Sequence, residues 1–231
     1  MKISPLLVML AFCLGISGCK KYKCEGDCET VIIKGRVFEA ANNNGCNNVK
    51  VHAKLYQRSS CIFCNDEIIG TVKTNRDGTF ELKTKLNPVY FSSQYLGVFI
   101  DVPDGLADDL GISSNSKFSM ITFYDYDVSK MQTLKYPLYK RTTAAITIKN
   151  IQQSSFSTLS LDHYFSSNLS FADIIGRPAS SGDTTIIITT AADVFTKLKL
   201  RKVISPGFAD EVIDSAKFST NASSNKFELG Y

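Results

Sequence analysis

Four cysteines stand in two close pairs, and their spacing allows three kinds of chemistry. Cys24 and Cys28 are separated by three residues, and Cys61 and Cys64 by two. Four thiolates in this arrangement could bind Zn²⁺ tetrahedrally, and Cys61 with Cys64 alone could form a redox dithiol. The same residues could form structural disulfides, which persist outside the cytoplasm. The redox interpretation is weakened because no helix that would stabilise a thiolate is evident after Cys64.

The other polar residues offer little for catalysis. His52 falls at an outward position of an alternating segment, and His163 stands beside Asp162 in an expected turn. Neither histidine has a third ligand at motif spacing, and no Gly-x-Ser-x-Gly motif accompanies the serines. We therefore expect two surface histidines, no catalytic residues, no metal ion and no cofactor, and we do not expect an enzyme.

Two further groups could bind a ligand. Asp101, Asp104, Asp108 and Asp109 offer hard oxygen ligands for Ca²⁺, but their spacing matches no known calcium loop, so a solvated loop is favoured. A set of aromatic residues could form an exposed platform for glycans or peptides, although alternating aromatics more often belong to a core. This set comprises Tyr90, Phe91, Tyr95, Phe99, Phe123, Tyr124 and Tyr126.

The N-terminal segment is typical of a targeting signal. Lys2 precedes an apolar stretch too short to span a bilayer comfortably. The stretch ends in Ile16-Ser17-Gly18-Cys19, which resembles the lipobox of bacterial lipoproteins. The resemblance implies that residues 1–18 are removed and that Cys19 carries the lipid anchor. Because Lys20 and Lys21 follow in place of acidic residues, we expect the periplasmic side of the outer membrane rather than the cell surface.

Composition limits the partners and the size of the core. The chain has 26 Lys and Arg against 22 Asp and Glu, and this small excess does not argue for nucleic acid. With 44% hydrophobic residues, 231 residues can form one or two domains. The lipid at Cys19 supplies the membrane contact, and another envelope protein or a glycan is the expected partner.

Strand patterns dominate the first half of the mature chain. The polar residues 19–29 read as a tether. Residues 31–38 are rich in β-branched types, and Val49, Val51, Ala53 and Leu55 alternate with polar residues as in a half-buried strand. Residues 68–84 predict a hairpin that turns at Asp77-Gly78 and points Phe80 and Leu82 inward. Further strands are expected at 95–102, 117–126 and 132–139.

A second series of short strands is expected after residue 141. Its members are residues 144–149, 156–161, 184–190, 195–203 and 226–229. Short strands divided by Ser, Asn, Gly and Asp clusters are typical of β-sandwiches. We place one domain at 30–140 and a second, Ig-like sandwich at 141–231.

Residues 30–84 resemble a known domain. Gly35-Arg36-Val37, residues 44–51, Gly70-Thr71-Val72-Lys73-Thr74 and Asp77-Gly78-Thr79-Phe80 occur in the order found in the carboxypeptidase regulatory-like domain. This domain is a transthyretin-like (prealbumin-like) β-sandwich common in lipoproteins of Bacteroidota. Cys46 and Asn48 depart from its usual aliphatic residue and Gly. The resemblance covers about a quarter of the chain and implies a binding, spacing or stabilising module without catalytic residues.

The proposed fold constrains the cysteine pairing. If strand 31–38 runs antiparallel to strand 49–56, Cys24 and Cys28 lie near Cys61 and Cys64. Cys46 then lies about 25 Å away at the other end of the strand, beyond the roughly 7 Å Cα limit of a disulfide. We therefore expect Cys24 and Cys28 to pair with Cys61 and Cys64, and Cys46 to remain a free, mostly buried thiol.

The sequence thus predicts an all-β protein of two β-sandwich domains in tandem, the first transthyretin-like. Its expected role is that of a lipid-anchored, extracytoplasmic, non-catalytic binding or scaffold module. Two alternatives remain open: a thiol-active or metal-binding protein centred on Cys61 and Cys64, and a surface binder of glycans or peptides.

Overall fold

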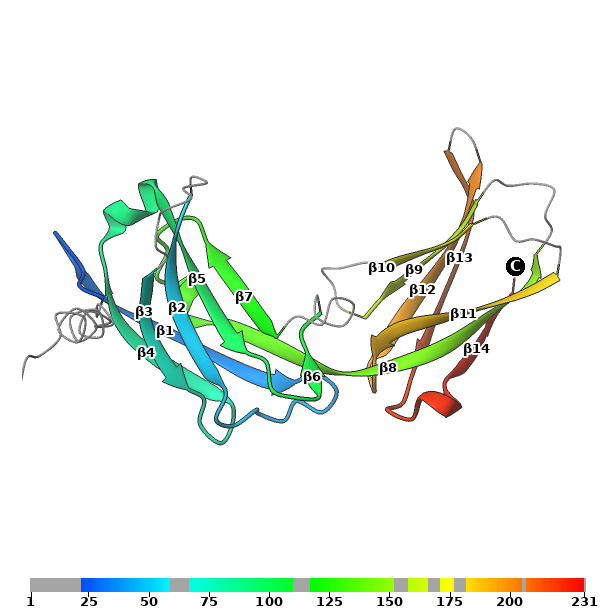
Figure 1. Ribbon diagram of the computed structural model, residues 1–231, viewed down its shortest axis with the longest axis horizontal. Coiled ribbons are helices and arrows are strands. Elements are labelled where there is room, and N and C mark those ends of the chain that lie inside the picture. The colour runs from blue at the N-terminus through cyan, green and yellow to red at the C-terminus, as the bar shows by residue number, and fades with distance from the viewer. Residues whose placement is uncertain are drawn as a thin grey trace, which may run out of the picture.

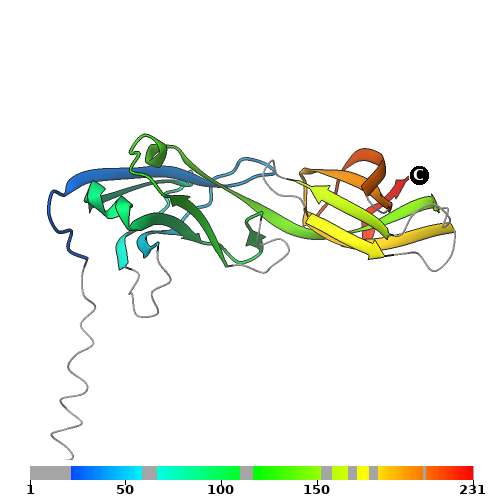
Figure 2. The same ribbon diagram turned by 90° about the horizontal axis from the view of Figure 1, so that it is seen from above.

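The computed structural model describes residues 22–58, 67–109, 117–151, 158–165, 171–176, 182–204 and 207–230. Within them the chain is built of β-strands and short 3₁₀ turns, so the predicted all-β class is confirmed. No helix in this part of the chain is long and apolar enough to cross a membrane. Two β-sandwiches follow one another along the long axis of the molecule (Figures 1 and 2).

The first sandwich packs two sheets face to face. One sheet has the order β4-β1-β8, with β6 also paired to β8, and the other has the order β3-β2-β5-β7. Its strands are β1 (Glu29–Glu39), β2 (Lys50–Gln57), β3 (Glu67–Lys73), β4 (Thr79–Leu86), β5 (Gln94–Asp101), β6 (Leu106–Ala107) and β7 (Phe118–Phe123). The 3₁₀ turns η1 (Pro88–Ser92) and η2 (Lys130–Gln132) lie between strands.

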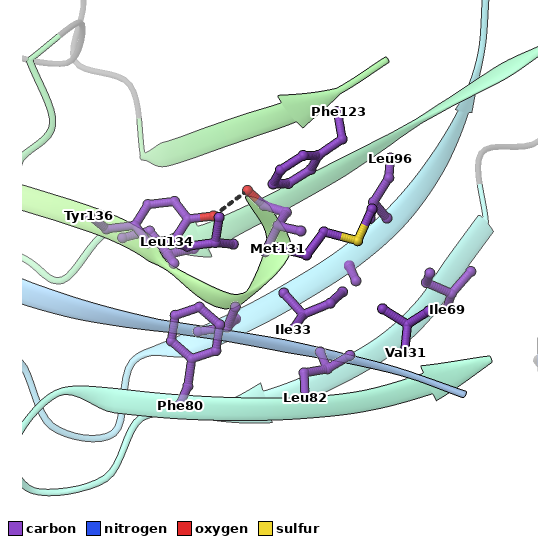
Figure 3. Close-up of a cluster of buried hydrophobic side chains, with 14 of the residues drawn as sticks. Val31, Ile33, Ile69, Phe80, Leu82, Leu96, Phe123, Met131, Leu134 and Tyr136 are labelled. Atoms are coloured by element: carbon purple, nitrogen blue, oxygen red, sulfur yellow. Dashed lines mark hydrogen bonds between the residues drawn. The ribbon is translucent and has the colours of Figure 1, made fainter. Parts of the chain in front are cut away.

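Alternation along each strand fills the core between these sheets. Val51, Ala53 and Leu55 are buried as predicted, and so are Phe80 and Leu82. The predicted hairpin over residues 68–84 was wrong, because β3 pairs with β2 while the chain after Gly78 crosses to the other sheet, where β4 pairs with β1. Figure 3 shows their neighbours, with Met131 and Tyr136 between the two sheets. The hydroxyl of Tyr136 donates to the carbonyl of Val98 at 2.6 Å, which satisfies its polar end inside the core.

The second sandwich repeats this plan. One sheet holds β11, β8 and β14, and the other has the order β10-β9-β12-β13. Its strands are β9 (Thr158–Tyr164), β10 (Phe171–Gly176), β11 (Gly182–Ala191), β12 (Phe195–Ile204), β13 (Gly207–Lys217) and β14 (Lys226–Leu229), with η4 (Ala222–Ser224) before β14. Strands β6, β10 and β13 were not predicted. The buried residues between the sheets include Ile146, Leu161 and Leu198.

One long strand belongs to both sandwiches. Strand β8 (Leu134–Ile151) pairs with β1 through residues 134–138 and with β11 through residues 141–151. The sequence predicted two separate strands here, and the boundary placed at residue 141 falls inside β8. A small cluster of Ala107, Tyr139 and Ala191 is buried where the sandwiches meet, and the ring of Phe165 packs edge-on against Tyr139 at 5.2 Å.

A buried asparagine ties β8 to the C-terminal segment. The side-chain amide of Asn225, which is 5% exposed, donates to the Thr142 hydroxyl at 2.9 Å and to the carbonyls of Thr143 and Ser219 at 3.0 and 2.8 Å. Its side-chain oxygen accepts from the Ser219 backbone amide at 2.9 Å. Since buried polar groups must keep their partners, this residue fixes the approach of the last strand.

We expect Asn225→Ala to lower the free energy of unfolding of the second sandwich by roughly 2–3 kcal/mol, because the buried Thr142 hydroxyl and three part-buried backbone groups lose their partner. Urea unfolding followed by circular dichroism measures the change. The control is Asn221→Ala, which removes an exposed cap of η4 and should cost about 1 kcal/mol. Equal losses of unfolding free energy in the two variants would show that the buried amide of Asn225 contributes no more to stability than the exposed cap.

Candidate binding face of the first sandwich

The outer face of the sheet β3-β2-β5-β7 gathers aromatic and apolar side chains in solvent. Val51, Ala53 and Leu55 point into the core, so His52, Lys54 and Tyr56 must point outward from β2. The same alternation turns residues 95, 97 and 99 of β5 and residues 118, 120 and 122 of β7 to this face. The pairing register then places these side chains in rows that run across the strands.

The first row is a stack of three tyrosines between two cations. Tyr56 lies opposite Tyr95 in the register, and their ring centroids are 5.0 Å apart with planes 9° from parallel. Tyr124, just beyond β7, packs on Tyr95 at 5.4 Å. The Lys54 ammonium lies 4.7 Å from the centre of the Tyr56 ring, and the Arg58 guanidinium lies 5.9 Å from that of Tyr124. Ring stacking and cation–π attraction both stabilise this order.

Arg58 also fixes the ends of three strands. Its Nε donates to the carbonyl of Gln94 at 3.0 Å, where β5 begins. Its Nη2 donates to the carbonyl of Tyr124, just after β7 ends. Because Arg58 itself follows β2, one guanidinium joins β2, β5 and β7 at this edge of the face. The tyrosine row is therefore held in place before any ligand arrives.

The second row crosses the same strands four residues further along, two outward positions from the first. The imidazole of His52 stacks on Phe99 at 4.9 Å, and Phe118 packs edge-on against Phe99 at 6.2 Å. The His52 ring is oriented by Thr71, whose hydroxyl is 3.0 Å from Nδ1, and by Asp101, whose carboxylate is 3.5 Å from Nε2. His52 is thus part of an ordered aromatic row, and the carboxylate beside it gives this end of the face a negative group.

Gly97 lies between the two rows and allows them to approach. A Cβ at this position would lie 2.6 Å from a ring carbon of Tyr56 and 3.0 Å from the sulfur of Met120. Only glycine therefore lets both side chains cover the middle strand. Met120 is 48% exposed, Phe118 58% and Tyr124 59%, so this face presents a large apolar surface to water.

The structure divides the seven aromatic residues that the sequence grouped. Tyr95, Phe99 and Tyr124 belong to this face, whereas Phe91 and Phe123 are buried in the core. The Tyr126 hydroxyl donates to Glu29 at 2.8 Å, and burial together with this bond raises the pKa of Tyr126 to about 12. Tyr90 contacts the N-terminal segment.

Sequence reasoning missed several members of the face. His52, Lys54 and Tyr56 were marked as outward by the alternation of β2, but nothing in the sequence paired β2 with β5. The β7 residues Phe118 and Met120 were missed for the same reason. Register between strands distant in the chain decides which side chains become neighbours, and a single sequence does not contain it.

The N-terminal segment is docked on the sandwich. The Tyr22 hydroxyl donates to the carbonyl of Lys85 at 3.0 Å, and burial raises the pKa of Tyr22. The backbone amide of Glu25 donates to the Tyr90 hydroxyl at 2.8 Å, and the Asn87 side-chain amide donates to the carbonyl of Glu25 at 2.9 Å. Residues predicted as a tether thus lie along the end of β4 and the turn that follows.

Cys24 and Cys28 were expected to pair with Cys61 and Cys64, and this expectation was wrong. Cys24 is bonded to Cys28, with their Cα atoms 6.2 Å apart. The expectation rested on an antiparallel pair of β1 and β2, but these strands lie in different sheets. A turn in which Gly26 adopts a φ of +77° brings the two cysteines within bonding range instead.

The other cysteines bear on the alternative chemistries. Cys46 is half-buried against the core, and among the described residues it is a free cysteine. Burial raises the pKa of its thiol, which disfavours a reactive thiolate. Cys61 and Cys64 lie outside the described residues, as does Cys19. Within the described part of the chain, no group of three or more His, Cys, Asp or Glu could hold a metal ion.

The expectation of a surface His163 in a turn was wrong, because this residue lies in β9 and is 3% exposed. Register places it beside Leu198. Its neighbour Asp162 is also buried and accepts from the Ser160 hydroxyl at 3.2 Å and from Arg201. Both residues therefore belong to the buried part of the second sandwich.

Three of the four clustered aspartates have different surroundings. Asp101 lies beside His52, and Asp104 pairs with Lys117 at 3.0 Å. Asp108 is 4% exposed, so the expected solvated loop is wrong at that position. Strand β6 explains the difference, because its pairing with β8 draws this stretch onto the sandwich.

Comparisons with known proteins add little beyond the architecture. No family model and no curated protein matches the chain. Among solved structures, the Bacillus anthracis TIE protein aligns with 87% of this chain at 10% identity and a TM-score of 0.33, and the chain covers 33% of its length. Shaft pilin SpaA from Lactobacillus rhamnosus GG aligns with 88% of this chain, and 97% of its own, at 9% identity and a TM-score of 0.30.

A putative adhesin from Bacteroides ovatus aligns with 87% of this chain and 93% of its own, at 8% identity and a TM-score of 0.26. Similarity at this level carries no conclusion about what this chain does. The case for function therefore rests on the chemistry of its own surfaces.

Trypsin digestion without reduction should release residues 24–34 as one peptide, lighter by two hydrogens than its reduced form, because Cys24 is bonded to Cys28. Mass spectrometry before and after reduction measures this difference. The peptide that contains Cys46 serves as the internal control and should keep its mass. A peptide joined to one containing Cys61 or Cys64 would contradict the observed bond.

Proposed function

We propose that this protein is a lipid-anchored, extracytoplasmic, non-catalytic module that binds another protein on the outer face of the sheet β3-β2-β5-β7. One observation carries the proposal: two ordered aromatic rows, with exposed apolar side chains between and beside them, cover a sheet face that no other element of the described chain covers. Exposed apolar patches of this kind mark interaction sites in soluble domains.

The composition of the face suits a polypeptide partner. Protein interfaces are enriched in Tyr, Phe, Met and Arg, and this face presents Phe118, Met120, Tyr124 and Arg58 together. Ile68 adds a further 51% exposed apolar side chain on β3. The rows are already ordered by stacking and by Arg58, so binding would freeze few side chains and lose little entropy.

A glycan fits the face less well. Sugars bind aromatic residues through exposed ring faces, but Tyr56 and Tyr95 turn a face toward each other, as do His52 and Phe99. Cations lie over the rings of Tyr56 and Tyr124. Much of the ring area is therefore used within the rows, and the surface offered to a ligand is a mixture of ring edges, apolar side chains and cations.

Photocrosslinking in cells tests the partner. We expect p-benzoylphenylalanine in place of Tyr124 to give a discrete protein adduct, while the same residue in place of Phe195 gives none. Phe195 is a matched control because it is 72% exposed but lies on the second sandwich. Mass spectrometry identifies the crosslinked chain.

A double variant links the adduct to the face. With the crosslinker at Tyr124, Phe118→Ser with Met120→Ser should reduce the adduct about tenfold, since truncating an interface anchor typically costs 1 kcal/mol or more. Phe195→Ser should leave it unchanged. An adduct that is a glycan, an adduct that persists in the double variant, or the absence of any adduct would contradict a protein-binding face.

The anchor is tested separately. We expect the chain recovered from the cell envelope to begin at Cys19 and to carry acyl groups, because Ile16 to Cys19 match the lipobox pattern. Intact-mass spectrometry measures the added mass, and Cys19→Ser is the matched variant that should lack it. Recovery of the natural chain without acyl groups, or with residues 1–18 still attached, would contradict the anchor.

A further inference from the structure

The opposite face of the first sandwich is basic. Phe80, Leu82 and the inward residues of β1 point into the core, so the intervening residues of β4-β1-β8 point outward. Among the strand residues on this face, five are basic and one is acidic. They are Lys34, Arg36, Lys83, Lys85 and Lys135, with Glu81 as the acidic residue.

The charges on this face are only partly neutralised. Glu81 pairs with Lys34 at 3.0 Å. Lys83, Lys85 and Lys135 are exposed, and Lys83 and Lys85 are successive outward residues of β4, at the edge of the sheet. Arg36 donates to the carbonyls of Asp77 and Asn43, and the Asp77 carboxylate close by offsets part of its positive charge. A net positive surface therefore runs from the edge of β4 across β1 to β8.

Two hollows are lined by these basic residues. One, of about 560 Å³, lies between the N-terminal segment and β4, and its lining includes Tyr22, Lys23, Lys83 and Lys85. The other, of about 630 Å³, is lined by residues of β1, β4 and the start of β8, including Lys34, Arg36 and Lys135 together with the acidic Glu81. Each hollow brings at least three cationic side chains around one space, which suits a phosphate group.

The docked N-terminal segment places this face next to the anchor. Cys19 precedes Tyr22 by three residues, so an acylated Cys19 lies within about 11 Å of Tyr22 even if the chain between them is fully extended. Tyr22 is held against Lys85 at the end of β4. The lysines of the first hollow therefore lie beside the segment that leads to the lipid attachment point.

We infer that the basic face of β4-β1-β8 lies on an anionic phospholipid surface, with lipid phosphates in the lysine-lined hollows. The inference rests on the lipid anchor of the proposed function and adds an orientation to it. The aromatic face lies on the other side of the sandwich, so this contact points the protein-binding face away from the membrane. Charge complementarity and the short distance to the anchor select a membrane over a free phosphate or a soluble polyanion.

Lysine acylation on vesicles tests the orientation. The processed lipoprotein is reconstituted in phosphatidylcholine vesicles, with or without about 30% phosphatidylglycerol, and treated with a membrane-impermeant amine-acylating reagent. We expect Lys83, Lys85 and Lys135 to react about fivefold more slowly on the anionic vesicles. In about 0.5 M salt the difference should disappear, because the Debye length then falls below about 5 Å. Lys117, at the start of β7, should react equally on both vesicles.

A pair of charge variants provides the matched control. Lys83→Gln with Lys85→Gln should abolish the protection of Lys135 on anionic vesicles. Lys197→Gln with Lys217→Gln, which removes two exposed lysines of the second sandwich, should leave it intact. Equal acylation of Lys83 and Lys85 on both vesicles, or equal protection of Lys117, would overturn the inferred orientation.

The outcomes separate the anchor from the orientation. Flotation with phosphatidylcholine vesicles reports the lipid anchor alone, because these vesicles carry no net charge. A chain that floats with both kinds of vesicle but shows no charge-dependent protection of its lysines would support the lipid anchor and contradict the inferred orientation. A chain that floats with neither kind of vesicle would contradict the lipid anchor and, with it, the inferred orientation. Protection by added inorganic phosphate in place of anionic lipid would assign the hollows to a free anion and overturn the membrane contact.

Discussion

The architecture depends on one strand that two sandwiches share. Strand β8 contains 18 residues, and the side chains that it sends into the two cores share one parity: Leu134, Tyr136 and Leu138 in the first core, and Ala144, Ile146 and Ile148 in the second. Tyr139, buried where the sandwiches meet, has the opposite parity. Since side chains alternate with a period of two, a one-residue slip anywhere in β8 would turn one of the two sets toward solvent. The register of each half therefore constrains the other.

This constraint explains why the strands were easier to predict from sequence than their arrangement. The alternation of Val51, Ala53 and Leu55 against polar neighbours identified β2 and its buried side. In contrast, Lys140, Arg141 and Thr142 interrupt the apolar pattern of β8, so a continuous strand looked like two with a linker. The three residues are tolerated because the strand crosses from one sandwich to the other there, and Thr142 is buried beside Asn225.

The candidate site was predicted only in part, for a related reason. Outward positions follow from alternation alone, so His52 could be placed outside, and Tyr95, Phe99 and Tyr124 could be proposed as exposed. That Tyr56 meets Tyr95, and that His52 meets Phe99, depends on pairing between strands about forty residues apart. The prediction for His163 was wrong for a simpler reason. Its polar neighbours suggested a turn, but the chain forms a central strand of a sheet there.

Period-two alternation gives the first sandwich two faces of different chemistry around one core. The outward residues of β2, β5 and β7 are largely aromatic or apolar, and the charged outward residues of β4, β1 and β8 are mostly basic. One domain can therefore contact two different surfaces on opposite sides without enlarging its core.

The rigid link between the sandwiches gives the second domain a defined place relative to these faces. At 3.3 Å per residue, β8 extends roughly 60 Å, and the buried contacts of Tyr139 with Ala107 and Ala191 restrict bending where the sandwiches meet. The N-terminal segment is docked at its own end by the Cys24–Cys28 turn and by Tyr22. If the anchor and the basic face fix the first sandwich on the membrane, the direction of β8 determines where the second sandwich lies. Its separation from the anchor is then set by strand pairing and not by a flexible linker, which is the property that a scaffold requires.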